Sequence, residues 1–269
     1  MDGVERARDA RGTLLLRNED LDPQRSRCEF VDAYLEDLRW LGIEWREGPD
    51  VGGPYAPYSQ SERRDVYLQA WKKLRDAGAI YACTCSRKDL AEAAQAPHET
   101  TNAPAAADDE PHYPGTCRDR GIASTANDPR GYNWRFRVPQ GRAITFRDLH
   151  LGEQHFTAGD DFGDFVVWRR DDVPAYQLAV VADDDAMRIT EVVRGCDLLR
   201  STARQLLLAE ALGIAPPRYY HCELLTDSAG QRLAKRHDAL SLRALRAAGH
   251  LPADVRRLWQ AQPAACFSP

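Results

Sequence analysis

Three cysteines in the first half of the chain have a spacing that suits a metal ion. Cys83 and Cys85 are separated by one residue, and Cys117 follows 32 positions after Cys85. Zinc takes four ligands at tetrahedral corners and prefers thiolates as soft donors. The fourth ligand must then be an oxygen or a nitrogen, and the nearby candidates are His98, His112, Tyr113 and Asp119. Such an ion would hold a polar segment that cannot bury its own core. Three unrelated buried cysteines are an equal alternative, because Cys-x-Cys is less diagnostic than Cys-x-x-Cys pairs.

Acidic side chains cluster in a polar turn near the N-terminus. Glu19, Asp20 and Asp22 follow a short apolar run at residues 13–17, which the pattern predicts to be a buried strand. Ligands of open α/β sheets bind at the carboxyl ends of strands. Carboxylates there suit an ammonium group or a ribose hydroxyl. The alternative is a solvated turn whose acids cap the next helix.

Three further positions carry groups suited to anions. Arg194 follows a predicted strand at residues 189–193, where its guanidinium could bind a carboxylate or phosphate. Tyr176 offers a hydroxyl within an apolar run, and Lys235 lies in the basic loop at residues 232–237, which could close over a polyphosphate. The alternatives are a surface ion pair, core packing and a solvated turn, respectively.

These groups need a scaffold, and the hydrophobic pattern predicts alternating strands and helices. The predicted strands lie at residues 13–17, 79–85, 133–138, 143–148, 165–169, 189–193 and 221–225. The predicted helices lie at residues 28–41, 61–77, 86–95, 175–182, 201–212 and 240–259. Residues 96–130 are poor in apolar side chains, which indicates a surface excursion. The expected fold class is α/β, with the middle third of the chain inserted as a smaller module.

Composition limits the kind of protein. The 269 residues carry a net charge of −5, with 43% hydrophobic and 29% charged side chains, as in ordinary globular proteins. This mild acidity argues against coating nucleic acid by bulk charge, although the Arg-rich residues 243–257 could offer a local patch for RNA. We expect no membrane helix, because the sequence has no sufficiently long apolar run. We expect no signal peptide, because the N-terminus has no apolar segment. Seven cysteines, an odd number, favour a reducing, cytoplasmic setting, with single buried thiols at Cys28, Cys196, Cys222 and Cys266.

Several long stretches resemble class I glutamyl-tRNA synthetases. They are LLLRNEDLDPQRS, DLRWLGIEWREGPDVGGPYAPYSQSERRDVY, DFVVWRRDDVPAYQLAVVADD, ITEVVRGCDLL and RLAKRH, and the similarity runs from about Val4 to Leu242. The resemblance implies a Rossmann-type catalytic domain, truncated at its N-terminus, with an inserted zinc-bearing subdomain.

Two features resemble the short glutamyl-Q tRNA(Asp) synthetases within this group. One is the Cys-x-Cys…Tyr-x-x-x-Cys pattern, which is similar to their zinc signature. The other is that only 33 residues (269 − 236) follow the Arg-Leu-Ala-Lys-Arg loop, too few for the helical anticodon-binding domain of a full synthetase. The resemblance implies that L-glutamate and ATP form glutamyl-adenylate without tRNA, with Mg²⁺ accompanying ATP. It further implies that a monomer with no membrane partner transfers the glutamate to queuosine at position 34 of tRNA(Asp).

The resemblance also implies residue roles. Glu19 matches the position that pairs with the substrate ammonium, and Tyr176 and Arg194 match the other glutamate-binding positions. Lys235 matches the second lysine of the KMSKS-like loop, the catalytic and ATP-binding position, while Ala234 stands in place of the loop serine. The implied ligands of one structural Zn²⁺ per chain are Cys83, Cys85, Tyr113 and Cys117.

The expected domain organisation follows the same resemblance. Residues 1–81 and 189–242 form the two halves of the catalytic domain, residues 82–188 the zinc-bearing subdomain, which resembles an acceptor-binding module, and residues 243–269 a short helical tail. The pattern departs at the front, where residues 1–12 resemble only the second half of the first helix and no HIGH-like sequence occurs. Either the true start lies upstream of Met1, or the chain is a decaying or repurposed copy. Two other functions stay open: a fragment of a glutamyl-tRNA synthetase that charges tRNA(Glu), and a catalytically silent zinc-containing module that binds RNA or a partner.

Overall fold

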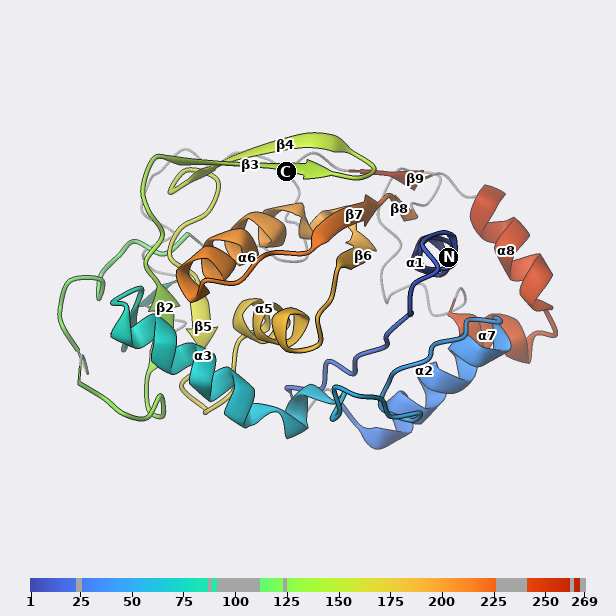
Figure 1. Cartoon of the computed structure of the whole chain (residues 1–269), viewed down its shortest axis with the longest axis horizontal. Helices are drawn as coiled ribbons and strands as arrows, with labels where there is room; N and C mark the ends of the chain where they lie inside the picture. The colour runs from blue at the N-terminus through green and yellow to red at the C-terminus, as the bar shows by residue number, and fades with distance from the viewer. Residues whose placement is uncertain are drawn as a thin grey trace. The chain divides into compact units, whose positions relative to one another are not determined.

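The structure is a computed structural model, and it describes residues 1–22, 26–86, 89–90, 112–122, 125–225, 241–261 and 264–266. The chain divides into two units, each treated by itself below. Unit 1 contains Met1–Gln60, Val193–Cys196 and the described residues of Cys222–Ser268. Unit 2 contains Ser61–Val192 and Asp197–His221. Figure 1 shows the elements with the labels used from here on.

A three-stranded antiparallel sheet of unit 2 carries the candidate metal ligands. Its strands are β1 (Ile80–Cys83), β2 (Asn133–Phe136) and β5 (Val166–Trp168), in the order β1-β2-β5. All four residues of β1 are buried, as a continuous apolar strand of a core sheet should be. The large aromatic side chains Trp134 and Trp168 are also fully buried. The sheet is therefore a rigid support for whatever follows Cys83.

A second, mixed sheet has the order β4-β3-β7-β6. Its strands are β3 (Arg142–Asp148), β4 (Gly152–Ala158), β6 (Glu191–Gly195) and β7 (Arg218–Cys222). Strands β3 and β4 form an antiparallel hairpin, whereas β3 and β7 run parallel. A buried pair joins two of the strands, because His221 lies 2.6 Å from the carboxylate of Asp148 and both side chains are fully buried.

Three helices complete the core of unit 2. They are α3 (Arg64–Asp76), α5 (Tyr176–Ala186) and α6 (Leu199–Leu212), with short 3-10 turns at η1 (Gln60–Glu62) and η2 (Cys196–Leu198). Helix α5 packs against both α3 and α6 (Figure 1). Helix α6 ends at Gly213, whose φ of +69° suits glycine.

The described part of unit 1 consists mostly of helices. They are α1 (Asp2–Asp9), α2 (Cys28–Trp40), α7 (Leu242–Ala247) and α8 (Pro252–Ala261), with a small pair of strands, β8 (Leu224–Leu225) and β9 (Ala264–Ala265). Leu41, Leu245 and Val255 form a buried cluster in this unit. Arg246 of the basic tail is also engaged, because it forms an ion pair with Glu36 at 2.8 Å.

Most predicted elements are present, and the exceptions have local causes. Residues 13–17 are not a strand, because they pair with residues 46–47 through a single bridge and two backbone hydrogen bonds. The predicted helix at residues 240–259 is two helices, because Gly249 adopts a φ of +86° and Pro252 starts α8. Strand β4 was not predicted. The predicted helix at residues 86–95 lies largely outside the described residues, and the basic loop at residues 232–237 lies wholly outside them.

Two cysteines expected to be single thiols form a disulfide. Cys196 and Cys266 are joined, with their Cα atoms 5.8 Å apart. The pairing of β9 with β8 brings the end of the chain back to β8. Cys266 follows directly after β9. Among the described cysteines the free thiols are Cys83, Cys85, Cys117 and Cys222. Within the same described ranges, every helix is too short or too polar to span a bilayer.

Candidate functional site

Four side chains of the predicted zinc signature come together at the end of β1. The Sγ atoms of Cys83, Cys85 and Cys117 all lie within 4.8 Å of one another. The Tyr113 hydroxyl lies 3.3 Å from Cys83 Sγ and 3.5 Å from Cys85 Sγ. Cys83, Tyr113 and Cys117 are buried, whereas Cys85 is half-buried. Three thiols and one phenol therefore converge on a small volume within unit 2.

The local backbone explains how these side chains meet. Cys83 is the last residue of β1, which pairs along its whole length with β2. Cys117 lies in a turn that begins at Gly115, where φ is +79°. The N–H of Arg118 closes this turn by donating to the Gly115 carbonyl at 2.8 Å. The N–H of Cys117 donates to the Tyr113 hydroxyl at 2.9 Å, which fixes the tyrosine against its own turn.

The environment separates the pKa values of these groups. Burial raises the pKa of the Cys85 thiol to about 11 and raises the pKa of the Tyr113 hydroxyl above its usual range. Burial also acts to raise the pKa of Cys117, but hydrogen bonds from the Thr84 backbone and from Tyr113 outweigh it, so this pKa falls to about 6. The environment therefore favours the thiolate form at Cys117 more than at Cys85.

The donor set fits zinc. In a tetrahedral site with Zn–S bonds of ~2.3 Å, neighbouring sulfur atoms lie roughly 3.8 Å apart. The Sγ atoms of Cys85 and Cys117 are 3.6 Å apart. Hard cations such as Mg²⁺ and Ca²⁺ prefer sites made only of oxygen, which this site is not. A bound cation would also favour the deprotonated forms of the three thiols and of Tyr113.

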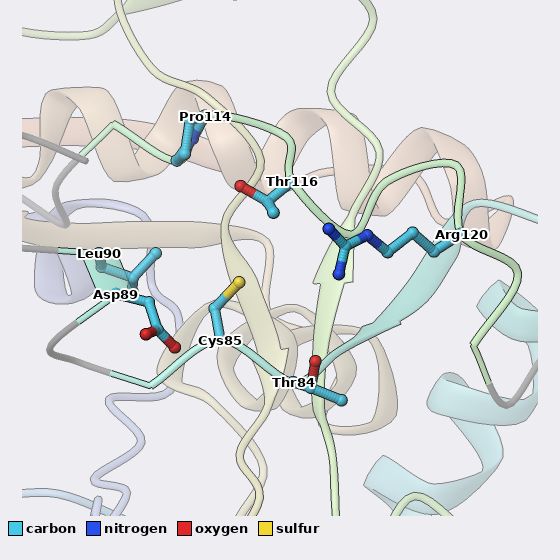
Figure 2. A pocket seen from close by; sticks show the side chains of 7 residues that line it. All are labelled: Thr84, Cys85, Asp89, Leu90, Pro114, Thr116 and Arg120. Atoms are coloured by element: carbon cyan, nitrogen blue, oxygen red, sulfur yellow. The ribbon is translucent and has the colours of Figure 1, made fainter. Parts of the chain in front are cut away.

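A pocket of about 350 Å³ opens beside the sulfur cluster (Figure 2). Its lining residues are Thr84, Cys85, Asp89, Leu90, Pro114, Thr116 and Arg120. Figure 2 shows the Cys85 side chain between Asp89 on one side and Arg120 on the other. Cys83 and Cys117 do not line this pocket, so Cys85 is the member of the cluster that solvent reaches through it.

Among the described candidates for a fourth ligand, Tyr113 is the one that reaches the sulfur atoms. His112 is exposed, and its ring lies so close to Gly163 that a Cβ there would come within 3.1 Å of it. Asp119 accepts a 3.1 Å hydrogen bond from Arg137. His98 lies outside the described residues.

The residues expected to bind glutamate and ATP are distributed over both units. Glu19 belongs to unit 1 and forms a 3.6 Å ion pair with Arg17. Arg194, in β6, also belongs to unit 1 and is half-buried. Tyr176 belongs to unit 2 and is the first residue of α5. Lys235 lies outside the described residues. The structure therefore brings together the metal candidates, whereas the glutamate candidates are divided between unit 1 (Glu19 and Arg194) and unit 2 (Tyr176).

Sequence reasoning missed the polar network that surrounds the metal candidates. Asp164 is buried and accepts hydrogen bonds from the Tyr81 hydroxyl at 2.5 Å and from the Val138 N–H at 2.8 Å. Arg135 is buried in β2 and donates to the Asp164 carbonyl at 3.0 Å. An arginine inside a strand pattern gives no local signal of burial, so these residues could not be found from the sequence.

Comparison with known proteins sets the class. The family described as tRNA synthetases class I (E and Q), catalytic domain, matches residues 5–260, and the chain belongs to this family. It is thus an enzyme of the aminoacyl-tRNA synthetase class of ligases, with the α/β fold and mixed sheets described above.

Individual relatives narrow the group. The chain is 47% identical over 253 residues to the glutamyl-Q tRNA(Asp) synthetase of Nitratidesulfovibrio vulgaris, covering 93% of this chain and 75% of that one. It is 48% identical over 253 residues to the protein of the same name from Symbiobacterium thermophilum, covering 93% and 76%. Glutamate–tRNA ligase 2 of Nitrosococcus oceani is 43% identical over 249 residues, covering 91% and 51%. The predicted resemblance to glutamyl-Q tRNA(Asp) synthetases is confirmed.

A solved structure agrees with the family. The crystal structure of glutamate-tRNA synthetase from Elizabethkingia anophelis matches with a TM-score of 0.73 and 28% sequence identity, over 87% of this chain and 48% of that one. The chain therefore spans about half the length of that synthetase, in its shared catalytic fold.

Proposed function

We propose that this chain activates L-glutamate with ATP to glutamyl-adenylate without tRNA, and transfers the glutamate to queuosine at position 34 of tRNA(Asp). The observation that carries this proposal is the identity of 47% and 48% to two relatives named glutamyl-Q tRNA(Asp) synthetase, over 93% of the chain. The thiol–phenol cluster supports it, because all four side chains of the predicted zinc signature converge.

The proposed chemistry needs positioning more than proton transfer. The substrate carboxylate attacks the α-phosphate of ATP, a bond forms between that oxygen and phosphorus, and the bond from phosphorus to the α–β bridging oxygen breaks as pyrophosphate leaves. Mg²⁺ accompanying ATP would offset phosphate charge. Glu19 pairs with the substrate ammonium, and the Arg194 guanidinium binds a substrate carboxylate in its planar fork. The Tyr176 hydroxyl donates a hydrogen bond to the bound glutamate. Lys235 neutralises phosphate charge as adenylate forms.

The proposed metal is structural. Cys83, Cys85, Tyr113 and Cys117 would hold one Zn²⁺, which would tie the turn after Gly115 to the end of β1. When bound, the ion supplies a cross-link rather than a Lewis acid for the reaction.

The proposed domain limits are residues 1–81 and 189–242 for the catalytic halves, 82–188 for the zinc-bearing insertion and 243–269 for the tail. We also propose that the enzyme works as a monomer in the cytoplasm, where glutamate, ATP and tRNA are all present.

The test is glutamate-dependent ATP–pyrophosphate exchange without tRNA, followed by glutamate attachment to queuosine-containing tRNA(Asp). Both assays use the 269-residue chain and the same chain extended upstream. We expect exchange and attachment in at least one form, and loss of both in Arg194→Met. The matched control is Arg218→Met, because Arg218 is an exposed arginine of the neighbouring strand β7. Exchange without attachment to tRNA(Asp), in both forms, would refute the proposed acceptor.

A second candidate function is supported by other relatives. The chain is 43% identical to glutamate–tRNA ligase 2 of Nitrosococcus oceani, of which it covers 51%. This similarity favours a part of a glutamyl-tRNA synthetase that charges tRNA(Glu). Such a protein would attach glutamate to tRNA(Glu) and would leave queuosine-containing tRNA(Asp) unmodified in the same pair of assays.

A further inference from the structure

Arg135 is a buried cation beside the candidate metal centre. It lies in β2 directly opposite Tyr81 of β1, and only 2% of its surface is exposed. Its guanidinium carbon lies 4.0 Å from the centroid of the Tyr113 ring. A charged side chain is rarely buried this far without a partner that offsets the loss of water. The electron-rich face of the Tyr113 ring is one such partner.

The Tyr113 ring connects this cation to the sulfur atoms. Its hydroxyl lies 3.3 Å from Cys83 Sγ and 3.5 Å from Cys85 Sγ, and it accepts the Cys117 N–H at 2.9 Å. The ring is therefore held by a cation on its face and by the thiol cluster at its edge. A tyrosine fixed at both places presents its oxygen to the cluster without further rearrangement.

Arg135 is itself fixed by the network around Asp164. Its Nη1 donates to the Asp164 carbonyl at 3.0 Å. The Asp164 carboxylate accepts the Tyr81 hydroxyl at 2.5 Å and pairs with Arg118, the residue that follows Cys117. The same network thus holds the guanidinium and one end of the ligand turn. Its geometry leaves Arg135 little freedom to swing away from the ring.

The charge of the candidate centre explains why a cation belongs there. Three thiolates around a divalent ion leave one negative charge in excess, and a phenolate at Tyr113 makes the excess two. Cys83, Tyr113 and Cys117 are at most 4% exposed. An excess charge away from water is unfavourable unless a nearby opposite charge offsets it. We propose that Arg135 is a positioning residue of the metal centre, offsetting this negative charge and holding Tyr113 against the sulfur atoms. This inference rests on the zinc site proposed above.

The test compares two arginines that both lie over tyrosine rings. Arg135→Met removes the cation beside Tyr113 and keeps an unbranched side chain. Arg137→Met is the matched control, because the Arg137 guanidinium lies 4.8 Å from the centroid of the Tyr81 ring instead. The full chain of each variant is assayed for zinc content, for zinc affinity by competition with a chromogenic chelator, and for the absorption of its Co²⁺ form. We expect Arg135→Met to weaken zinc binding by about 10–100-fold, the range usual for groups that orient metal ligands.

The outcomes separate this inference from the zinc site itself. We expect Arg137→Met to bind zinc within a few-fold of the parent chain, and Arg135→Lys, which keeps the charge, to be weakened much less than Arg135→Met. Equal zinc affinity and equal Co²⁺ spectra in the two methionine variants overturn the role of Arg135 while leaving the zinc site intact. A parent chain that binds no zinc overturns both. If Arg135→Met does not fold, Arg135→Lys decides: zinc affinity as weak as that of Tyr113→Phe overturns the role of the charge.

Discussion

Unit 2 contains a buried ion pair between the start of α3 and helix α5, and removing the charge of one partner should destabilise this unit. Arg63 Nε donates to Asp183 Oδ1 at 2.6 Å, and the Tyr67 hydroxyl donates to Asp183 Oδ2 at 2.9 Å. The Asp183 side chain is fully buried, and the Arg63 side chain is 5% exposed. Asp183→Asn keeps the volume of the side chain but removes its charge. The variant therefore leaves a buried guanidinium facing an amide.

The expected loss in the free energy of unfolding depends on the buried Arg63 charge that remains after the substitution. Breaking a buried ion pair by neutralising one partner costs about 3–5 kcal/mol, because the other charge stays buried and loses its oppositely charged partner. Tyr67→Phe removes the hydrogen bond from the Tyr67 hydroxyl to Asp183, and a hydrogen bond to a charged group contributes about 1.5–3 kcal/mol. Asp185→Asn makes the same chemical change at an exposed position of α5 and should lie within about 0.5 kcal/mol of the parent. The expected order of destabilisation is Asp183→Asn, then Tyr67→Phe, then Asp185→Asn.

The assay is urea unfolding at pH 7, followed by far-ultraviolet circular dichroism. The free energy of unfolding and its slope with urea are both needed, since a changed slope signals altered compactness rather than a lost contact. Asp183→Asn within about 1 kcal/mol of Asp185→Asn would refute the reasoning, because it would mean that Arg63 finds equal compensation elsewhere.

Two further predictions concern the mixed sheet and the tail. Burial acts to raise the pKa of Asp148, but hydrogen bonds from backbone N–H groups and from His221 outweigh it and lower this pKa. The stabilisation is therefore complete above the unfolded pKa of about 3.9 and is lost as pH falls through the lower folded pKa. Asp148→Asn should cost about 3 kcal/mol near pH 7 and progressively less below about pH 4, whereas the exposed Asp160→Asn should show no such trend in urea unfolding. The disulfide between Cys196 and Cys266 closes a loop with a sequence separation of 70 residues, which stabilises by about 4 kcal/mol. Cys266→Ser should lower the melting temperature and make it insensitive to reductant; an unchanged melting temperature of the parent chain in reductant would contradict this.

Local patterns predicted much of the fold. The helix at residues 28–41 was predicted from apolar spacing, and α2 occupies Cys28–Trp40. Gly213 was predicted to stop the helix at residues 201–212, and it does so with a positive φ. In these elements the residues that carry the pattern are the same residues that form the helix. The element can therefore be predicted from one sequence alone.

Contacts between distant residues could not be predicted in the same way. The network of Tyr81 with Asp164 joins residues 83 positions apart, and nothing in either segment indicates the other. The Cys196–Cys266 pair likewise depends on β9 returning to β8. The convergence of Tyr113 with Cys83 was expected only from the resemblance, because spacing alone left four candidates for the fourth ligand.

The sheet order suggests how the metal candidates and Tyr176 are related within unit 2. Strands β1 and β5 both run antiparallel to β2, so their carboxyl ends lie at the same edge of the sheet. Cys83 is opposite Asn133, and Trp168 is opposite the next residue, Trp134. The last residue of β1 and the last residue of β5 therefore stand one strand apart at the same edge.

The chain then returns from that edge to begin α5. The Ala175 N–H donates to the Val167 carbonyl of β5 at 3.0 Å, immediately before Tyr176 starts the helix. A cross-link that stabilises the end of β1 also stabilises β5, because both strands pair with β2. The start of α5 is hydrogen-bonded to β5 and is stabilised with it. A structural metal would in this way affect Tyr176, the proposed glutamate-binding residue, without contacting it.

Loss of a proposed metal ligand should therefore affect the strand and the helix start that share this edge. Cys117→Ser should speed amide hydrogen exchange at residues 166–178, where a loss of about 1 kcal/mol in local stability corresponds to roughly fivefold faster exchange. The hairpin at residues 142–158, which belongs to the other sheet, is the internal control and should exchange as in the parent chain. A uniform increase over both segments would indicate general destabilisation, and no increase at residues 166–178 would show that β2 does not couple the two ends. Only a selective increase agrees with a sheet edge that the ligand turn and α5 share.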